Sequence, residues 1–183
     1  HQVTLLIGHY ATFREKSLAQ EMETFTTTEN LAGHFKKLSA GNFDAIFHAA
    51  AVSDFKFGKV FSRHDSGEIC EINSGKFSTC AGNLLAELVP TPKIIASLRE
   101  WFPRAKIIGW KYEVDGNRDD VLKKAAAQIL ENKTDASVAN GPAYGPGFGL
   151  VRGKDESADF VEREDLFLAL EKLTGVEKPS LPD

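Results

Sequence analysis

A length of 183 residues fits one domain of ordinary size with a sizeable core, and 42% hydrophobic with 26% charged residues is the balance of a globular protein. The net charge of −4 argues against a broad nucleic-acid-binding surface, which needs clustered lysine and arginine. It leaves room for a small basic pocket around one phosphorylated molecule. No stretch approaches about 18 apolar residues, so no membrane span is expected.

The first half of the chain alternates between apolar strands and one amphipathic helix. The sequence starts directly in a strand pattern, without Met, so we expect it to be a fragment that lacks the first strand, glycine-rich turn and helix of its fold. We predict strands over Val3–Ile7, Met22–Thr27 and Asp44–His48, and a helix over Glu29–Leu38 that is capped by Thr28 and closed by Gly41.

Residues 56–90 interrupt this alternation. They are rich in Lys, Ser, Gly and Thr, and the alternating stretches Gly67–Ile72 and Leu84–Val89 predict a hairpin-like β extension rather than another βαβ unit. The two cysteines, Cys70 and Cys80, form no CxxC pair, so they indicate neither a metal site nor a redox site. We expect both thiols to be reduced and the protein to be cytoplasmic.

The second half returns to strands and helices and ends in a short antiparallel pair. We predict helices over Lys93–Trp101, Asp119–Glu131 and Glu164–Leu173, with strands over Lys106–Gly109, Ala136–Ala139, Phe148–Arg152 and Asp159–Glu162. Strands separated by helices predict an α/β fold of the Rossmann-like, doubly wound kind with a mostly parallel sheet. We expect a single domain over residues 1–173 and a loose tail over 174–183.

Such sheets bind ligands beyond the carboxyl ends of their strands. Asp54 follows the strand Asp44–His48 after a run of alanines, Trp110, Lys111 and Glu113 follow Lys106–Gly109, and Asn140 follows Ala136–Ala139. Each has an ordinary structural explanation by itself, because alanines pack tightly, Trp110 suits a core, and Asn140 and Asp54 suit turns. Together they predict a small-molecule site, most readily for a nucleotide. His9, His34, His48 and His64 lack ligand spacing, so no metal site is predicted from protein side chains.

The segment from Ala49 to Phe55 resembles the Ala-Ala-Val-x-Asp-Phe segment of the phosphopantothenoylcysteine synthetase family. Further segments resemble the family in the same order across residues 44–173. These are Lys76 at the position of the active-site lysine, Pro90–Ile95 as the Pro-x-Ile stretch, Gly109–Glu113 as Gly-Phe-Lys-x-Glu with Trp110 for Phe, and Asp135–Asn140 as Asp-x-x-Val-Ala-Asn.

Three departures from the family pattern stand out. The glycine-rich segment that holds nucleotide phosphates is absent from the sequence. Ser78 and Thr79 stand where bacterial members carry further lysines, which is closer to the stand-alone eukaryotic type and leaves ATP and CTP both open. Gln128 and Asn132 lie near positions that are basic in the bacterial type, with only Lys133 adjacent.

The resemblance implies a ligase of coenzyme A biosynthesis that joins 4′-phosphopantothenate to cysteine through an acyl-nucleotide, with ATP or CTP as co-substrate and Mg²⁺. It implies a catalytic role for Lys76 and a homodimer formed through residues 56–90. The ligand-binding residues that it implies are Ala50, Ala51, Asp54, Pro92, Lys93, Ile94, Ile95, Trp110 and Asn140. The alternative is a Rossmann-like nucleotide-binding protein or NAD(P)-dependent reductase without ligase activity.

Overall fold

The computed structural model describes residues 1–13, 17–76, 83–154 and 156–175. Its central sheet has five strands in the order β10-β9-β8-β7-β3. Strands β3 (Ala45–His48), β7 (Lys106–Tyr112) and β8 (Ala136–Asn140) are parallel, while β9 (Phe148–Val151) and β10 (Ser157–Phe160) add an antiparallel edge. The predicted mostly parallel, Rossmann-like sheet is confirmed.

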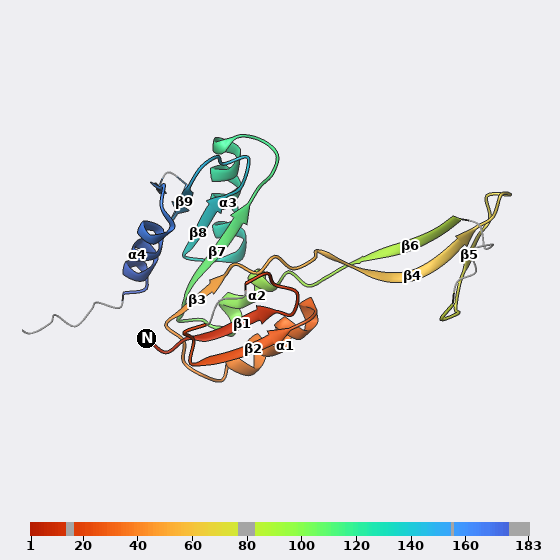
Figure 1. Cartoon of the computed structure of the whole chain (residues 1–183), viewed down its shortest axis with the longest axis horizontal. Coiled ribbons are helices and arrows are strands. Elements are labelled where there is room, and N and C mark those ends of the chain that lie inside the picture. Colours follow the sequence, from red (N-terminus) through yellow and green to blue (C-terminus); the bar gives the residue numbers. More distant parts are fainter. Residues whose placement is uncertain (14–16, 77–82, 155, 176–183) are drawn as a thin grey trace, which may run out of the picture.

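The first two strands form a small sheet of their own. Strands β1 (Thr4–Gly8) and β2 (Glu21–Phe25) are parallel to each other, and they are not hydrogen-bonded to the five-stranded sheet. Leu6 and Phe25 nevertheless pack into the hydrophobic core that lies beneath the first two helices. The small sheet therefore belongs to the same domain body, beside β3 (Figure 1).

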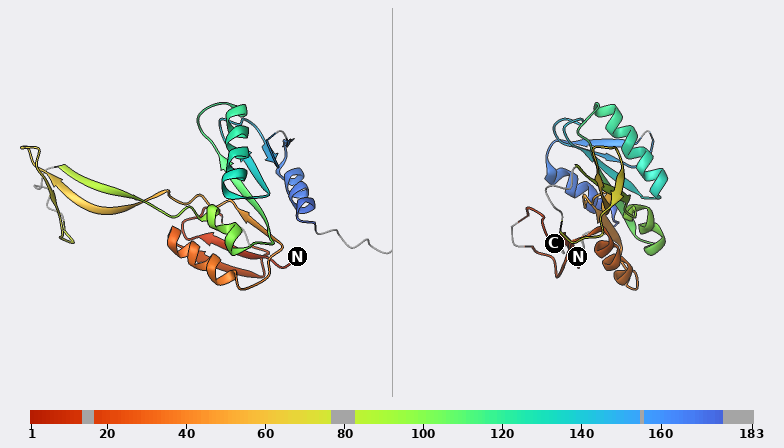
Figure 2. Two further views of the ribbon diagram at one scale, coloured as in Figure 1. Left: turned by 180° about the vertical axis from the view of Figure 1, so that it is seen from behind. Right: turned by 90° about the vertical axis from the view of Figure 1, so that its right-hand side faces the viewer.

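Helices cover both faces of the five-stranded sheet. Helices α1 (Thr28–Leu38), α2 (Ile94–Trp101) and α3 (Arg118–Asn132) lie on one face, and α4 (Arg163–Leu173) lies on the other (Figure 2, right). The alternation of β7 explains this division, because Ile107 points into the core under α1 and α2 while Ile108 points into the core under α4. Both side chains are fully buried.

The helix boundaries follow from capping chemistry. The N-cap of α1 is Thr27, whose hydroxyl accepts a hydrogen bond from the Asn30 amide, so the predicted cap at Thr28 was wrong by one residue. Helix α3 begins with a capping box in which Asn117 and Asp120 accept hydrogen bonds from each other's backbone amides. Among the helices that the structure describes, none is long and apolar enough to cross a membrane.

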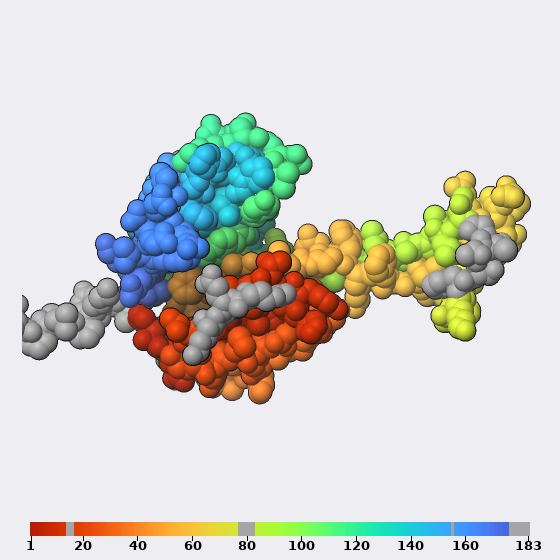
Figure 3. All heavy atoms as spheres, in the orientation of Figure 1, coloured from red at the N-terminus to blue at the C-terminus, as the bar shows by residue number. Residues whose placement is uncertain are grey.

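Residues 55–76 and 83–90 form an arm that projects from the domain (Figures 1 and 3). The arm contains β4 (Phe55–Arg63), β5 (Ile69–Glu71) and β6 (Asn83–Pro90) in the order β5-β4-β6. The two alternating stretches predicted from the sequence do not pair with each other, because both pair antiparallel with β4. The predicted extension is present, but it is a three-stranded sheet rather than a hairpin of those two stretches. Cys80 and the end of the tail lie outside the described residues.

Candidate functional site

The carboxyl ends of β3, β7 and β8 lie along one edge of the sheet, as parallel pairing requires. The register places His48 opposite Gly109 and Tyr112 opposite Asn140. Ala50, Ala51 and Asp54 follow β3, Trp110 lies near the end of β7, and Asn140 ends β8. Three of the predicted segments thus meet at the expected edge, which we call the carboxyl edge.

Asn140 has the clearest sign of a missing partner at this edge. Its Oδ1 atom is buried and has no hydrogen-bond partner within the described structure, which is rare for a buried polar atom. The backbone of Asn140 is fixed, because its carbonyl accepts a hydrogen bond of 3.1 Å from the Glu113 amide. Gly141 follows with a φ of 112°, and a Cβ there would lie 2.5 Å from the Glu113 carbonyl oxygen. The turn thus requires glycine, and it ends the strand at an amide oxygen that has no protein partner among the described residues.

Trp110 is part of the hydrophobic core under α4, where it is partly buried beside Ile108 and Val138. Its packing role is therefore established, and any ligand contact would use its exposed remainder. Tyr112 lies two residues further on the same face of β7, is 61% exposed and is the register partner of Asn140. Tyr112 was not predicted as a site residue, although its spacing of two from Trp110 in a strand was an available signal.

Two lysines share one carboxylate next to this turn. The Glu113 carboxylate accepts a hydrogen bond from Lys124 of α3 and forms an ion pair of 2.9 Å with Lys111. These contacts, that of Lys124 first, hold the pKa of Glu113 below its usual value. Lys111 and Glu113 were expected at the edge, but Lys124 lies eleven residues after Glu113 on a helix and had no local signal.

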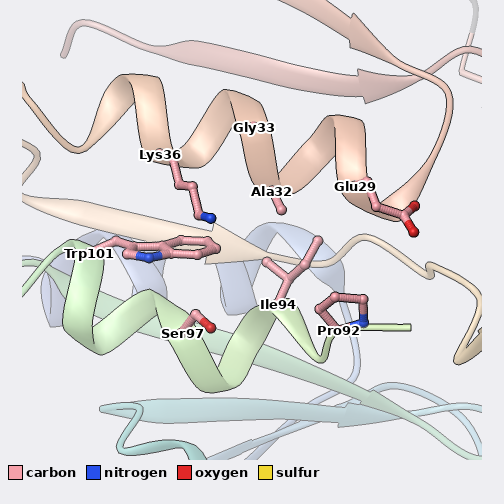
Figure 4. A pocket seen from close by; sticks show the side chains of 8 residues that line it. All are labelled: Glu29, Ala32, Gly33, Lys36, Pro92, Ile94, Ser97 and Trp101. Atoms are coloured by element: carbon pink, nitrogen blue, oxygen red, sulfur yellow. The ribbon is translucent and has the colours of Figure 1, made fainter. Parts of the chain in front are cut away.

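The stretch from Pro92 to Ile95 divides between three environments. Pro92 and Ile94 line a groove of about 320 Å³ between α1 and α2, together with Glu29, Ala32, Gly33, Lys36, Ser97 and Trp101 (Figure 4). Ile95 is buried, and its Cδ1 lies 2.9 Å from where a Cβ on Gly109 would be. Lys93 forms an ion pair of 3.7 Å with Glu131 of α3. In this structure these four residues are not gathered around one ligand position.

Lys76 is exposed and lies on the arm rather than at the carboxyl edge of its own chain. It follows β5 by five residues, and among the described residues β5 pairs only with Phe61–Arg63, the outer part of β4. The arm extends away from the domain (Figure 2, left). Within one chain, Lys76 is therefore separated from Asn140 and Trp110.

The search for a family model found no match. A curated protein of Thermococcus kodakarensis, the coenzyme A biosynthesis bifunctional protein CoaBC, is 32% identical over 120 residues, which are 66% of this chain and 27% of that protein. The chain is thus similar to CoaBC over about two thirds of its own length. The resemblance found in the sequence is thereby confirmed, and the chain spans about a quarter of the length of this relative.

Solved structures agree with this relationship at the level of the fold. The DNA/pantothenate metabolism flavoprotein of Streptococcus pneumoniae has a TM-score of 0.78 at 21% identity, over 96% of this chain and 81% of that chain. The C-terminal domain of a CoaBC has a TM-score of 0.66 at 18% identity, over 95% of this chain and 74% of that chain. Cab2 mutant H337A in complex with phosphopantothenate-cysteine has a TM-score of 0.60 at 21% identity, over 85% of this chain and 53% of that chain.

His48 makes the stability of the fold depend on pH. Its ring is buried beside Phe35, and burial lowers its pKa from 6.5 to about 4. The unfolded chain therefore binds this proton at higher pH than the folded chain. The contribution of neutral, buried His48 to the free energy of unfolding is complete above about pH 6.5 and is lost as the pH falls toward 4.

We expect the free energy of unfolding of His48→Gln to fall less steeply below pH 7 than that of the wild type. The free energy of unfolding of the wild type should fall by about 2 to 3 kcal/mol more than that of the variant between pH 7 and pH 4. Urea titrations at several pH values measure the difference, and His64→Gln, at an exposed arm position, is the control. Parallel pH profiles for wild type and His48→Gln would contradict the assignment.

Proposed function

We propose that this chain is the ligase part of a phosphopantothenate–cysteine ligase of coenzyme A biosynthesis, using ATP or CTP as co-substrate. The observation that carries the proposal is the unpartnered Oδ1 of Asn140 at the carboxyl edge, where the Ala50–Asp54 and Trp110–Glu113 segments also lie. These are the segments that resemble the synthetase family, and the chain is similar to CoaBC. The alternative of a reductase is not favoured, since the relatives found are CoaBC proteins.

The proposed reaction begins at a carboxylate, which is a poor acyl donor. The carboxylate of 4′-phosphopantothenate attacks the α-phosphate of the nucleotide and releases pyrophosphate. The amine of cysteine then attacks the acyl-nucleotide, which gives an amide and a nucleoside monophosphate. Negative charge gathers on phosphate oxygens in the first step, so a nearby ammonium group lowers its barrier. Lys76 is the residue proposed for this role.

The remaining proposed residues bind and orient the ligands. Asn140 would accept a hydrogen bond from a ligand through its unpartnered Oδ1, and the exposed part of Trp110 would contact the nucleotide. Ala50 and Ala51 have small side chains that let a ligand approach the backbone after β3. Pro92 and Lys93 precede α2 and Ile94 and Ile95 begin it, and their dispersed environments support a bordering role rather than direct contact.

The residues at the edge fit a Mg²⁺ ion that is bound mainly through nucleotide phosphates. No group of three His, Cys, Asp or Glu side chains among the described residues could hold a metal ion. Mg²⁺ in nucleotide sites commonly keeps several waters and uses one or two carboxylates, so a protein cage is not required. Asp54 is the exposed carboxylate available after β3, whereas Glu113 is occupied by two lysines. The ion would supply charge compensation on the phosphates.

The arm supports a homodimer and a role for Lys76 across it. The register of β4 and β6 puts Phe55, Phe57, Leu84 and Leu88 on one side of the arm, which we call the apolar arm face. All four are exposed in the single chain, and Phe57 is 79% exposed. Because an apolar surface of this kind is typical of an interface, we infer that a second copy covers it and that Lys76 serves the carboxyl edge of that copy.

Ligand binding tests the proposed function. We expect Asn140→Ala to weaken binding of ATP or CTP with Mg²⁺ by about threefold to tenfold, because one hydrogen bond to the ligand is lost. Calorimetry measures the dissociation constants, with NADH titrated in parallel. Asn42→Ala is the matched control, since Asn42 precedes β3 at the opposite edge and bonds to Arg104. Tight NADH binding without triphosphate binding would overturn the ligase proposal.

A further inference from the structure

The turn that follows Asn140 is anchored by one buried tyrosine. Tyr144 is 2% exposed and packs against Val121 and Ala125 of α3 and against Val151 of β9. Its amide donates to the Gly141 carbonyl at 3.0 Å, and the neighbouring Ala143 amide donates to the Glu113 carbonyl at 3.1 Å. The ring of Tyr144 is therefore tied through one short turn to the end of β8.

Two charged groups from different elements meet at the hydroxyl of Tyr144. The hydroxyl donates to Asp159 Oδ1 of β10 and accepts a hydrogen bond of 2.9 Å from Arg118, the first residue of α3. Arg118 also pairs with Asp159 at 2.5 Å and lies over the tyrosine ring, 4.3 Å from its centroid. Burial, followed by the hydrogen bond to Asp159, raises the pKa of Tyr144 to about 12, so the phenol stays protonated as a donor.

Three glycines around this cluster have no room for a side chain. A Cβ on Gly149 would lie 2.7 Å from the Tyr144 hydroxyl. Gly147 has a φ of 85°, and a Cβ there would lie 2.3 Å from the Phe160 carbonyl oxygen. Gly141 closes the other end of the turn against Glu113. The turn from Gly141 to Gly147 thus packs closely against the end of β7, β9 and β10, and Tyr144 anchors it.

We propose that Arg118, Tyr144 and Asp159 form a positioning cluster that fixes the Asn140 turn in the conformation that binds the nucleotide. The three residues join α3, the turn and β10, and none of them needs to touch the ligand. The amide oxygen of Asn140 can bind a ligand well only if it is held at one position on the carboxyl edge. The cluster restrains the turn that follows Asn140 and so holds it there. This inference rests on the proposed function, since it takes Asn140 to be a nucleotide contact.

Tyr144→Phe tests the cluster with the smallest change, because the ring is kept and both hydroxyl bonds are lost. We expect the dissociation constant of ATP or CTP with Mg²⁺ to rise on the order of tenfold, as expected for hydrogen bonds to charged groups. In turnover, the KM of the nucleotide should rise while the KM of cysteine stays unchanged. Asp159→Asn should have a similar effect, and Tyr144→Phe combined with Asp159→Asn should add little, because the three residues act as one unit.

A matched control lies on the same strand pair. Arg152 and Glu156 form an exposed ion pair at 2.7 Å that also joins the ends of β9 and β10, and Glu156→Gln breaks it without touching the turn. We expect Glu156→Gln to bind nucleotide like the wild type. Unchanged nucleotide binding in Tyr144→Phe, beside weakened binding in Asn140→Ala, would overturn the positioning role and leave the proposed function intact. Unchanged binding in Asn140→Ala would overturn the premise that Asn140 contacts the nucleotide, and with it the positioning role, whereas tight NADH binding without triphosphate binding would overturn the proposed function.

Folding effects are separated by circular dichroism and by the second variant. If Tyr144→Phe does not fold, Asp159→Asn decides, because Asp159 is largely exposed and its replacement keeps the side-chain shape. Weakened nucleotide binding by folded Asp159→Asn supports the cluster, and wild-type binding refutes it.

Discussion

Replacing Lys76 with alanine is expected to lower the rate of pyrophosphate release by about 10²- to 10³-fold while the melting temperature stays the same. Loss of one ammonium group that stabilises developing charge costs about 2 to 4 kcal/mol in the transition state. The side chain is exposed and follows β5 on the arm, so its removal takes little from the packed core. The assay contains 4′-phosphopantothenate, cysteine and either triphosphate. Lys123→Ala, at an exposed position of α3, is the control.

Mixing Lys76→Ala with Asn140→Ala tests whether Lys76 acts on a second copy, at a nucleotide concentration low enough that the weak binding of Asn140→Ala limits its turnover. In a mixed dimer of Lys76→Ala and Asn140→Ala, one edge has an intact Asn140 and faces an arm with an intact Lys76. Random exchange should therefore restore up to about a quarter of the wild-type activity if the site is shared between chains of a symmetric dimer. No recovery after exchange, verified with tagged chains, would place Lys76 and Asn140 in the same chain's site. Wild-type turnover by Lys76→Ala alone would make the lysine a solvated arm residue.

Much of the fold could be predicted because the buried strands carry strong periodic signals. Ile107 and Ile108 are both buried, on opposite faces, which is the pattern of a central parallel strand. Strand β4 was not recognised because its register shifts between Phe57 and Val60, so its alternation changes phase at Gly58. A Cβ on Gly58 would lie 2.5 Å from the Glu87 carboxylate, which explains why glycine interrupts the pattern there.

The arrangement of the candidate site residues was predicted in part, because some of them follow the buried strands directly. Asp54, Trp110 and Asn140 could be placed at one edge because parallel strands bring their carboxyl ends together. Lys124, Tyr144 and Asp159 could not, since their partners come from other elements and no spacing along the chain indicates such contacts. Lys76 was expected beside the phosphate site because it resembles the family's active-site lysine, but the motif does not reveal that the arm extends away from its own domain.

Replacing Phe57 with glutamate is expected to convert the protein from a dimer to a monomer at micromolar concentration. Phe57 is paired with Leu88 in the register of the arm, and both are exposed on the apolar arm face. Burial of a phenylalanine contributes about 1.5 to 3 kcal/mol. A symmetric dimer would lose this twice, so the dissociation constant should rise roughly 10²- to 10⁴-fold, and the buried charge adds to the cost.

Multi-angle light scattering over a concentration series measures this change. Arg63→Glu is the matched control, because Arg63 belongs to the same strand and pairs with Asn83 on the other side of the arm, so the same negative charge is placed away from the apolar arm face. Since the exposed Phe57 contributes little to the folded monomer, the thermal melt of the isolated domain should change little.

If the dimer also completes the site, Phe57→Glu should lose ligase activity while it keeps its fold. Activity should return as the protein concentration is raised toward the new dissociation constant. A wild type that is a clean monomer at micromolar concentration would contradict the dimer, and full activity in monomeric Phe57→Glu would show that the carboxyl edge of a single chain is sufficient.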